Sequence, residues 1–207
     1  MNQISVESIM PVSQKKYKVR FDNGVVVELY KGDIKAFSLS EGKTLDEEQQ
    51  VVFFEEFLGK RATKRAMHLL EKCDRTECEI RNKLKKNMYP EECIDIAINY
   101  LYSYHYLDDM RYAQNYVMFY NETRSKQKIK RDLQAKGVGR EIINDVLEEY
   151  YQDNEMEQIK KLLEKKQFNP EGADAKEFNR VYSFLMRKGF KSSNVLKMMK
   201  KDNIYYD

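Results

Sequence analysis

The sequence predicts a mainly α-helical protein: three tandem three-helix repeats in an elongated array, preceded by a small N-terminal module that contains a β-hairpin. Three observations predict this fold. Two runs near the N-terminus alternate apolar and polar residues, the apolar period is helical from about residue 60 onward, and the helical part matches itself at shifts of 49 and 52 residues. The composition agrees, because 34% of the 207 residues are charged and only three are proline, which suits long solvated helices.

The β-hairpin is predicted from the stretch KYKVRFDNGVVVELY. Asn23 and Gly24 separate its two runs, and Asn-Gly favours a type I′ turn, in which both central residues have positive φ. The preceding stretch SVESIM predicts a third short strand. The alternating apolar residues are Tyr17, Val19 and Phe21 before the turn and Val25, Val27 and Leu29 after it.

Two short helices are expected between the hairpin and the repeats. Asp33 is placed to cap a helix that runs through Phe37. Thr44 and Glu47 have the spacing of a capping box ahead of the next helix, which leads toward residue 57. We therefore expect residues 1–57 to form the N-terminal module.

Nine helical segments come after this module, and they group in threes. The three repeats are expected at residues 58–106, 107–152 and 153–207. The predicted segments are 60–71, 76–87, 90–103, 109–121, 125–136, 139–151, 154–167, 173–188 and 192–201.

The internal match supports the repeats. Thr76 and Ser125 occupy equivalent positions and are N-cap candidates, and Gly137 and Gly189 stand where a helix needs a left-handed terminating residue. The apolar residues that overlie one another are Ile80, Ile129 and Val181; Leu84, Leu133 and Leu185; and Ile94, Ile143 and Val195.

The stretch YHYLDDMRYA, at residues 104–113, looks most like a site for chemistry. His105 with Asp108 and Asp109 allows two interpretations, a metal or acid/base site, or the joint between two helices. Histidine is enriched at positive φ, so His105 suits a helix C-terminus. Asp108 then caps the next helix, and Asp109 lies in its first turn, where the helix dipole favours a carboxylate. We interpret the stretch as a joint.

Other motifs of enzymes are absent from the sequence. It has no P-loop, no dinucleotide-binding glycine pattern, no nucleophile elbow and no zinc-protease motif, so we expect neither catalysis nor a cofactor. Its three cysteines form no Cys-x-x-Cys pair, and no metal site is expected. The N-terminus lacks the pattern of a secretory signal, and no apolar run is long enough to span a membrane. We expect a cytoplasmic monomer.

Positive charge is concentrated in the helical part. Residues 1–57 have seven Lys or Arg against ten Asp or Glu, whereas the remainder has thirty against twenty-four. The stretch RSKQKIKRDLQAKGVGR is the most basic, and a helical wheel places its first basic residues opposite Ile129 and Leu133. This face is either ordinary solvated surface or a docking surface for acidic protein or nucleic-acid phosphate. The candidate binding residues are Arg124, Lys128, Arg131, Lys136 and Arg140, with Lys64 and Arg65 in the first repeat.

The stretches RTECEIRNKL, YHYLDDMRYAQNYV and RSKQKIKRDLQAKGV, in this order and spacing, resemble the RecX family of bacterial regulators. In that family the joint usually reads Gly-Tyr-Leu-Asp-Asp, and here His105 takes the glycine position. The resemblance implies a non-catalytic protein that binds along the RecA–DNA nucleoprotein filament. It implies inhibition of ATP hydrolysis, strand exchange and co-protease activity, and therefore modulation of DNA recombination, DNA repair and the SOS response.

Two alternatives remain open from the residues alone. A helical-repeat protein of this charge could bind single- or double-stranded DNA directly, and such binding weakens steeply with salt. A plain helical scaffold would bind neither DNA nor recombinase.

Overall fold

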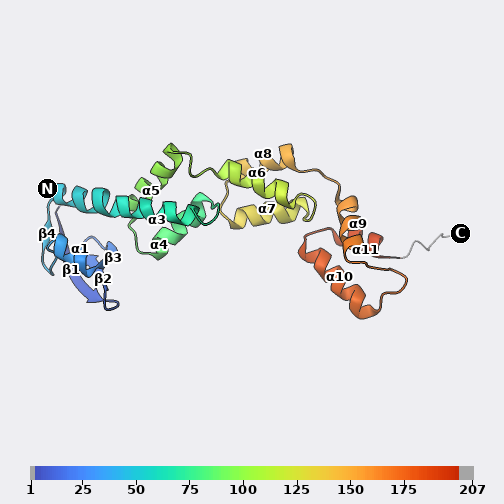
Figure 1. Cartoon of the computed structure of the whole chain (residues 1–207), viewed down its shortest axis with the longest axis horizontal. Coiled ribbons are helices and arrows are strands. Elements are labelled where there is room, and N and C mark those ends of the chain that lie inside the picture. Colours follow the sequence, from blue (N-terminus) through green and yellow to red (C-terminus); the bar gives the residue numbers. More distant parts are fainter. Residues whose placement is uncertain (1–2, 201–207) are drawn as a thin grey trace. The chain divides into compact units, whose positions relative to one another are not determined.

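The computed structural model describes residues 3–200, whose elements are drawn in Figure 1. Strands and a short helix come first, and the rest of the described chain is mostly helical. The chain divides between Asp108 and Asp109 into two compact units. The first unit contains all four strands of the described chain, and the second is built from helices.

The strands form one antiparallel sheet in the order β3–β2–β1–β4. The hairpin and the third strand are confirmed, because β2 pairs with β3 with Val19 opposite Val27, and β1 pairs with β2. Alternate residues of the hairpin, such as Phe21 and Leu29, are buried, as the two-residue period of a strand requires. The bounds are β1 (Ile4–Pro11), β2 (Lys16–Phe21), β3 (Val26–Tyr30) and β4 (Thr44–Leu45).

The turn of the hairpin differs from the prediction. Gly24 has φ of +84°, but Asn23 has no positive φ, so the type I′ turn was wrong. The backbone N–H of Gly24 donates to the carbonyl of Phe21, and the N–H of Phe21 donates to the carbonyl of Val25. These bonds close a three-residue loop that ends in a left-handed glycine, which is the next most common hairpin connection.

The first short helix, α1 (Lys31–Ala36), begins directly after β3. Asp33 is its third residue and not its cap, so that prediction was wrong. Its carboxylate instead accepts a hydrogen bond of 2.7 Å from the backbone N–H of Tyr30. The helix starts earlier than predicted because the strand leads into it without a loop.

The capping box before the second short helix also lies elsewhere. Thr44 belongs to β4, and the N-cap of α2 (Glu47–Gln50) is Asp46. The Asp46 carboxylate accepts from the N–H of Gln49 at 2.8 Å, and the Gln49 side chain accepts from the N–H of Asp46 at 3.2 Å. The predicted box of Thr44 and Glu47 is therefore wrong by two residues.

The N-terminal module and the first repeat share one hydrophobic core. Helix α2 continues through a π-helix, η1 (Val51–Gly59), into α3 (Lys60–Leu70). The rings of Phe53 and Phe54 pack on Phe21 of the sheet, with centroids 5.9 and 5.5 Å away. On the other side, the Cys93 thiol donates to the carbonyl of Phe54 at 3.2 Å. Burial raises the pKa of this thiol to about 12, so it stays protonated.

The structure confirms all nine predicted helical segments, with described ends that differ by a few residues at most. The predicted end of the last segment at residue 201, and the rest of the third repeat to residue 207, lie outside the described residues. Helices α3, α4 and α5 lie in the first unit, and the remaining six lie in the second. The bounds after α3 are α4 (Glu77–Lys86), α5 (Glu91–Ser103), α6 (Asp109–Tyr120), α7 (Lys126–Ala135), α8 (Arg140–Tyr150), α9 (Glu155–Lys165), α10 (Ala175–Arg187) and α11 (Ser192–Met199).

The repeats are confirmed by burial, because the residues that overlie one another are at most 3% exposed in every copy. The caps agree as well. The Thr76 side chain accepts from the N–H of Glu79, and the Ser125 side chain accepts from the N–H of Lys128, each at 3.2 Å. Gly137 and Gly189 both have positive φ after α7 and α10. The predicted caps and terminating glycines of the middle helices are therefore confirmed.

The stretch around His105 is a joint between helices. His105 has φ of +55°, and its backbone N–H donates to the carbonyl of Tyr102 in the last turn of α5. Helix α6 begins at Asp109, which places Asp108 at the N-cap position and Asp109 in the first turn. The interpretation as a helix end followed by a helix start is confirmed.

Within the second unit, each repeat has its own hydrophobic core. Polar groups connect the two repeats. The side-chain amide of Gln158 donates to the Asn121 carbonyl, and the Tyr151 hydroxyl contacts both Gln158 and the Arg124 carbonyl. Gln158 is 2% exposed, so these hydrogen bonds satisfy groups that water does not reach.

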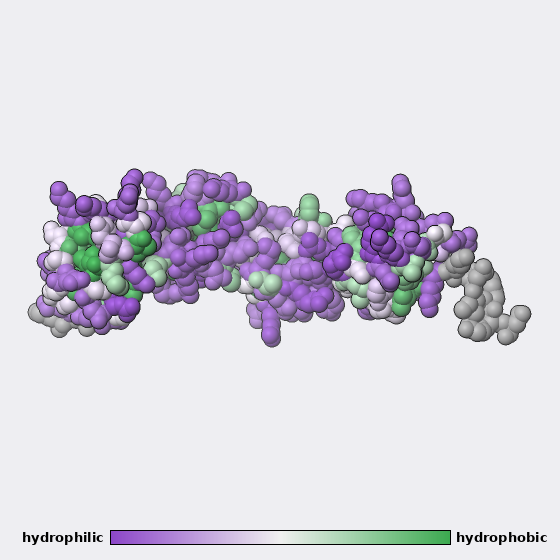
Figure 2. Space-filling model, turned by 90° about the horizontal axis from the view of Figure 1, so that it is seen from below, coloured by the Kyte–Doolittle hydropathy of each residue, from purple (hydrophilic) through white to green (hydrophobic). Residues whose placement is uncertain are grey.

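Hydrophilic residues cover most of the face in Figure 2, with hydrophobic residues reaching the surface over the N-terminal module. None of the helices in the described part of the chain has both the length and the apolar composition needed to cross a lipid bilayer.

Candidate functional site

The predicted basic residues of the second repeat lie around the N-terminus of α7. Arg124 precedes the N-cap Ser125 and is therefore outside the helix. Its guanidinium lies 3.5 Å from the ring centroid of Tyr120, and its Nη1 donates to the Tyr116 hydroxyl at 2.7 Å and to Asp132 at 2.6 Å. Arg124 is a packed, hydrogen-bonded residue and not a loose surface cation.

Asp132 neutralises part of this basic region. Its two carboxylate oxygens accept from Arg124 and from Lys128, and its side chain is 17% exposed. Burial acts to raise the pKa of Asp132, but the hydrogen bonds and charges of Lys128 and Arg124 outweigh it and hold that pKa below its ordinary value. Asp132 is therefore an anion at neutral pH, and it fixes two of the predicted binding residues in place.

The C-terminus of α10 packs against the same end of α7. The Ser125 hydroxyl donates to the Gly189 carbonyl at 2.6 Å, and the Ser125 N–H donates to the Lys188 carbonyl at 3.1 Å. The two backbones approach so closely that a Cβ on Gly189 would lie 2.6 Å from the Cβ of Lys128 and 3.4 Å from Nη2 of Arg131. Cations of α7 therefore meet the residues that end α10.

Further cations from the third repeat gather here. The ammonium groups of Lys166 and Lys188 lie 4.8 and 5.6 Å from the centroid of one ring, Phe184. Burial, followed by the positive charges of Arg124, Lys165 and Lys166, lowers the pKa of Lys188. We refer to the six cations as the junction cluster: Arg124, Lys128, Arg131, Lys165, Lys166 and Lys188.

The junction cluster has a structural explanation only in part. Lys165, Lys166 and Lys188 stand at helix C-termini, where the helix dipole favours a positive charge. Helix capping alone does not require cations of two repeats to gather where the end of α10 meets the start of α7. Like charges at short range repel one another, so an incoming anion would be bound favourably.

The other predicted binding residues are distributed differently. Lys136 has its ammonium 5.4 Å from the Tyr112 ring, and Arg140 is exposed at the first residue of α8. Lys64 and Arg65 lie on α3 of the first unit, the former exposed and the latter half-buried beside a cavity. The structure thus brings together Arg124, Lys128 and Arg131 and leaves the other four outside that group.

Lys188 belongs to the junction cluster but was not predicted from the sequence as a binding residue. The shift of 52 residues places it over Lys136, one residue before the terminating glycine of each middle helix. This equivalence was visible in the sequence. Its proximity to Arg124 was not, because that contact depends on how the second and third repeats pack.

Comparison with known proteins assigns the architecture. Models of the first, second and third three-helix domains of RecX match residues 62–101, 108–147 and 153–197. The chain belongs to the RecX family. The matched ranges correspond to helices α3–α5, α6–α8 and α9–α11, so each RecX domain is one repeat of the structure.

Sequence alignments with relatives extend over the N-terminal module as well. The regulatory protein RecX of Clostridium acetobutylicum is 30% identical over 209 residues, with 97% of each chain aligned. That of Clostridium tetani is 28% identical, with 90% of this chain and 92% of the relative aligned. A crystal structure of a regulatory protein RecX has a TM-score of 0.56 at 26% identity and covers 95% of this chain and 98% of its own. The RecX of Lactobacillus salivarius shares the fold, with a TM-score of 0.51 at 24% identity over 69% of this chain and 94% of its own.

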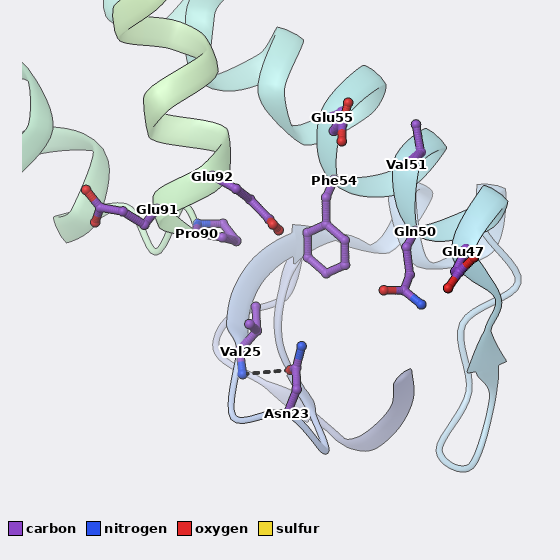
Figure 3. A pocket seen from close by; sticks show the side chains of 10 residues that line it. All are labelled: Asn23, Val25, Glu47, Gln50, Val51, Phe54, Glu55, Pro90, Glu91 and Glu92. Carbon is purple, nitrogen blue, oxygen red and sulfur yellow. Dashed lines mark hydrogen bonds between the residues drawn. The ribbon is translucent and has the colours of Figure 1, made fainter. Parts of the chain in front are cut away.

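The first unit of this RecX protein has an acidic cavity of about 520 Å³ between the hairpin tip, η1 and the start of α5. Figure 3 shows the Phe54 ring at its centre, with the Glu92 side chain directed toward it. Burial and the charge of Glu55 raise the pKa of Glu92. None of the ten described residues that line the cavity is a Ser, Thr, Cys, His or Lys, and its ionisable side chains are the four carboxylates of Glu47, Glu55, Glu91 and Glu92.

Among residues 3–200, no group of three or more His, Cys, Asp or Glu side chains is arranged to hold a metal ion. The relatives are named as regulatory proteins, which agrees with a role in regulation.

Proposed function

We propose that the protein is a non-catalytic regulator that binds the RecA–DNA nucleoprotein filament and inhibits its ATP hydrolysis, strand exchange and co-protease activity. It would thereby modulate DNA repair and the SOS response. The observation that carries this proposal is the match of all three RecX domains, in order, to the three repeats. Relatives that align over nearly the whole chain support the same role.

The junction cluster is the surface we assign to filament binding. Its six cations are accompanied by one carboxylate, Asp132, so the region remains strongly positive. Hydrogen bonds from Ser125 to the carbonyls of Gly189 and Lys188 hold the two repeats together, so the cations are already positioned before a ligand arrives. Such preorganisation reduces the entropy lost on binding.

The inhibition requires no bond chemistry. A protein that occupies the filament surface excludes a second DNA molecule or a protein substrate from that surface. Electrostatic attraction by the junction cluster would increase the association rate with a polyanionic filament. The remaining predicted residues, Lys64, Arg65, Lys136 and Arg140, are proposed as supporting contacts.

The test compares two triple variants. In the first, Arg131, Lys165 and Lys166 of the junction cluster are changed to Gln. In the matched control, three exposed lysines elsewhere, Lys35, Lys83 and Lys176, are changed to Gln, so that both variants lose the same charge. Inhibition of DNA-dependent ATP hydrolysis by RecA filaments is measured for both, and circular dichroism checks folding.

We expect the cluster variant to inhibit much more weakly than the wild type and the control to inhibit normally. Equal inhibition by both variants would exclude the junction cluster as the docking surface. If the wild type did not bind RecA filaments at all in a pull-down, the proposed function itself would be wrong.

Direct binding to DNA is the second candidate function, and the junction cluster favours it for the same electrostatic reason. Naked duplex DNA as a control in the pull-down separates the two. Direct binding should weaken with salt with a log–log slope of about 0.9 per neutralised phosphate.

A further inference from the structure

A second cavity lies in the first unit, between the sheet, α3 and the turn that joins α4 to α5. Its volume is about 320 Å³. Lys16 and Glu28 reach it from neighbouring strands, Arg61 and Arg65 from α3, and Tyr89 from the turn. Every side chain that lines it ends in nitrogen or oxygen, which distinguishes it from an apolar pocket.

Two of its cations are held in place by the protein. The Arg61 guanidinium donates to the Asp33 carboxylate at 2.7 Å. It also contacts two aromatic rings, 5.0 Å from the centroid of Tyr30 and 5.1 Å from that of Phe57. Lys16 pairs with Glu28. These contacts neutralise one charge each and orient the donors that remain on Arg61 and Lys16.

Two further donors have no partner. Among the residues that the structure describes, neither the guanidinium of Arg65 nor the hydroxyl of Tyr89 has a hydrogen-bond or ion-pair partner. Both are half-buried, and burial raises the pKa of Tyr89 while the nearby charges of Arg61 and Arg65 act in the opposite direction. Because their donor atoms are not fully buried, both groups can donate to an anion that enters the cavity.

The charge of the site favours an anion. With Lys16 offset by Glu28 and Arg61 offset by Asp33, Arg65 gives the site a net positive charge of one. Guanidinium groups bind phosphate oxygens with two parallel hydrogen bonds, and a tyrosine hydroxyl adds a third donor. The cavity is large enough for a phosphate group with part of the molecule that bears it.

We propose that the cavity formed by β2, β3, α3 and the α4–α5 turn binds a phosphate group, with Arg65 and Tyr89 as its direct ligands and Arg61 as the oriented supporting cation. The phosphate would come from a small free anion or from a nucleic-acid backbone. This inference does not depend on the junction cluster, although Arg65 is also proposed as a supporting contact in filament binding. It assigns a role to the N-terminal module, because that module supplies one wall of the site.

The test is isothermal titration of the full chain with inorganic phosphate, at an ionic strength kept constant with chloride. The variants are Arg65→Gln and Tyr89→Phe, and the matched control is Lys60→Gln, which removes an exposed charge from the same helix. Loss of a charge-assisted hydrogen bond should weaken phosphate binding about tenfold or more for Arg65→Gln. The Tyr89→Phe variant should bind a few-fold more weakly, and Lys60→Gln should bind as the wild type does.

A short oligothymidylate in a parallel titration identifies the source of the phosphate. If it binds, is displaced by inorganic phosphate and loses affinity in Tyr89→Phe, the site takes a nucleic-acid phosphate. If only inorganic phosphate binds, the site takes a small anion. The proposal is overturned if phosphate does not bind the wild type, or if Lys60→Gln loses as much affinity as Arg65→Gln. Should Arg65→Gln fail to fold, wild-type affinity in Tyr89→Phe would overturn it instead.

Discussion

Replacing Gly189 with alanine tests the contact between the second and third repeats. A Cβ at this position would lie 2.6 Å from the Cβ of Lys128 and 2.7 Å from Oγ of Ser125, well inside van der Waals contact. The φ of +87° is also unfavourable for any residue that has a Cβ. The substitution therefore strains the backbone and forces α7 and α10 apart at the same time.

The expected magnitude has three parts. The left-handed conformation costs alanine about 1–2 kcal/mol. Overpacking costs about 1–3 kcal/mol. Separation of the two helices also weakens the 2.6 Å hydrogen bond from Ser125 to the Gly189 carbonyl, which contributes about 1 kcal/mol. Together, Gly189→Ala should reduce the free energy of unfolding of the second unit by about 3–6 kcal/mol.

Gly24→Ala is the matched control. Gly24 has a nearly identical φ of +84°, but a Cβ there would meet nothing within 4 Å. This variant should lose only the strain of about 1–2 kcal/mol. Urea unfolding followed by circular dichroism measures both variants. If Gly189→Ala is no less stable than Gly24→Ala, the close approach of the two repeats does not exist in solution.

Three further predictions concern single features. Asp132→Asn should destabilise the protein at neutral pH, because the folded state lowers the pKa of the Asp132 carboxyl below its unfolded value of about 3.9. The wild type has this stabilisation above about pH 3.9 and loses it as the pH falls through the lower folded pKa. In urea unfolding, the stability difference between the two proteins should therefore shrink in acid. His105→Gly should stabilise the protein by up to about 1 kcal/mol in the same assay, since glycine accepts a φ of +55° without a Cβ clash. A large loss of stability would mean that the imidazole has an essential partner. Removal of residues 1–57 should leave a protein that aggregates, because Phe53 and Phe54 complete the hydrophobic core beside Cys93. Gel filtration and circular dichroism test this. A fragment that is monomeric and helical would contradict the shared core.

Local signals explain why the helices were predicted well. The apolar period, the caps at Thr76 and Ser125 and the glycines at 137 and 189 all act within one or two turns of helix. The errors have a non-local cause. Competing turn types and competing caps differ by little free energy, and the sheet decided between them, for example by placing Thr44 in β4 and leaving Asp46 as the cap.

The basic face of α7 shows the limit of a helical wheel. The wheel correctly placed Ile129 and Leu133 in the core. It treated Arg124 as part of the helix, whereas Arg124 lies before the cap and folds back onto Asp132 and two tyrosines. A helical wheel contains no information on which charged side chains form ion pairs, because a residue outside the helix, such as Arg124, can fold back onto it.

The sequence by itself determined the helices of the repeats, the caps at Thr76 and Ser125, the three repeats and the family, because these depend on residues close to one another or on a spacing that recurs along the chain. Only the tertiary structure decided which charges gather and which are neutralised. Ser125 and Gly189 are 64 residues apart, and Arg61 and Asp33 are 28 apart. Whether such residues meet depends on how the apolar faces of whole elements pack, and that packing places the junction cluster and the phosphate cavity where a single element shows neither.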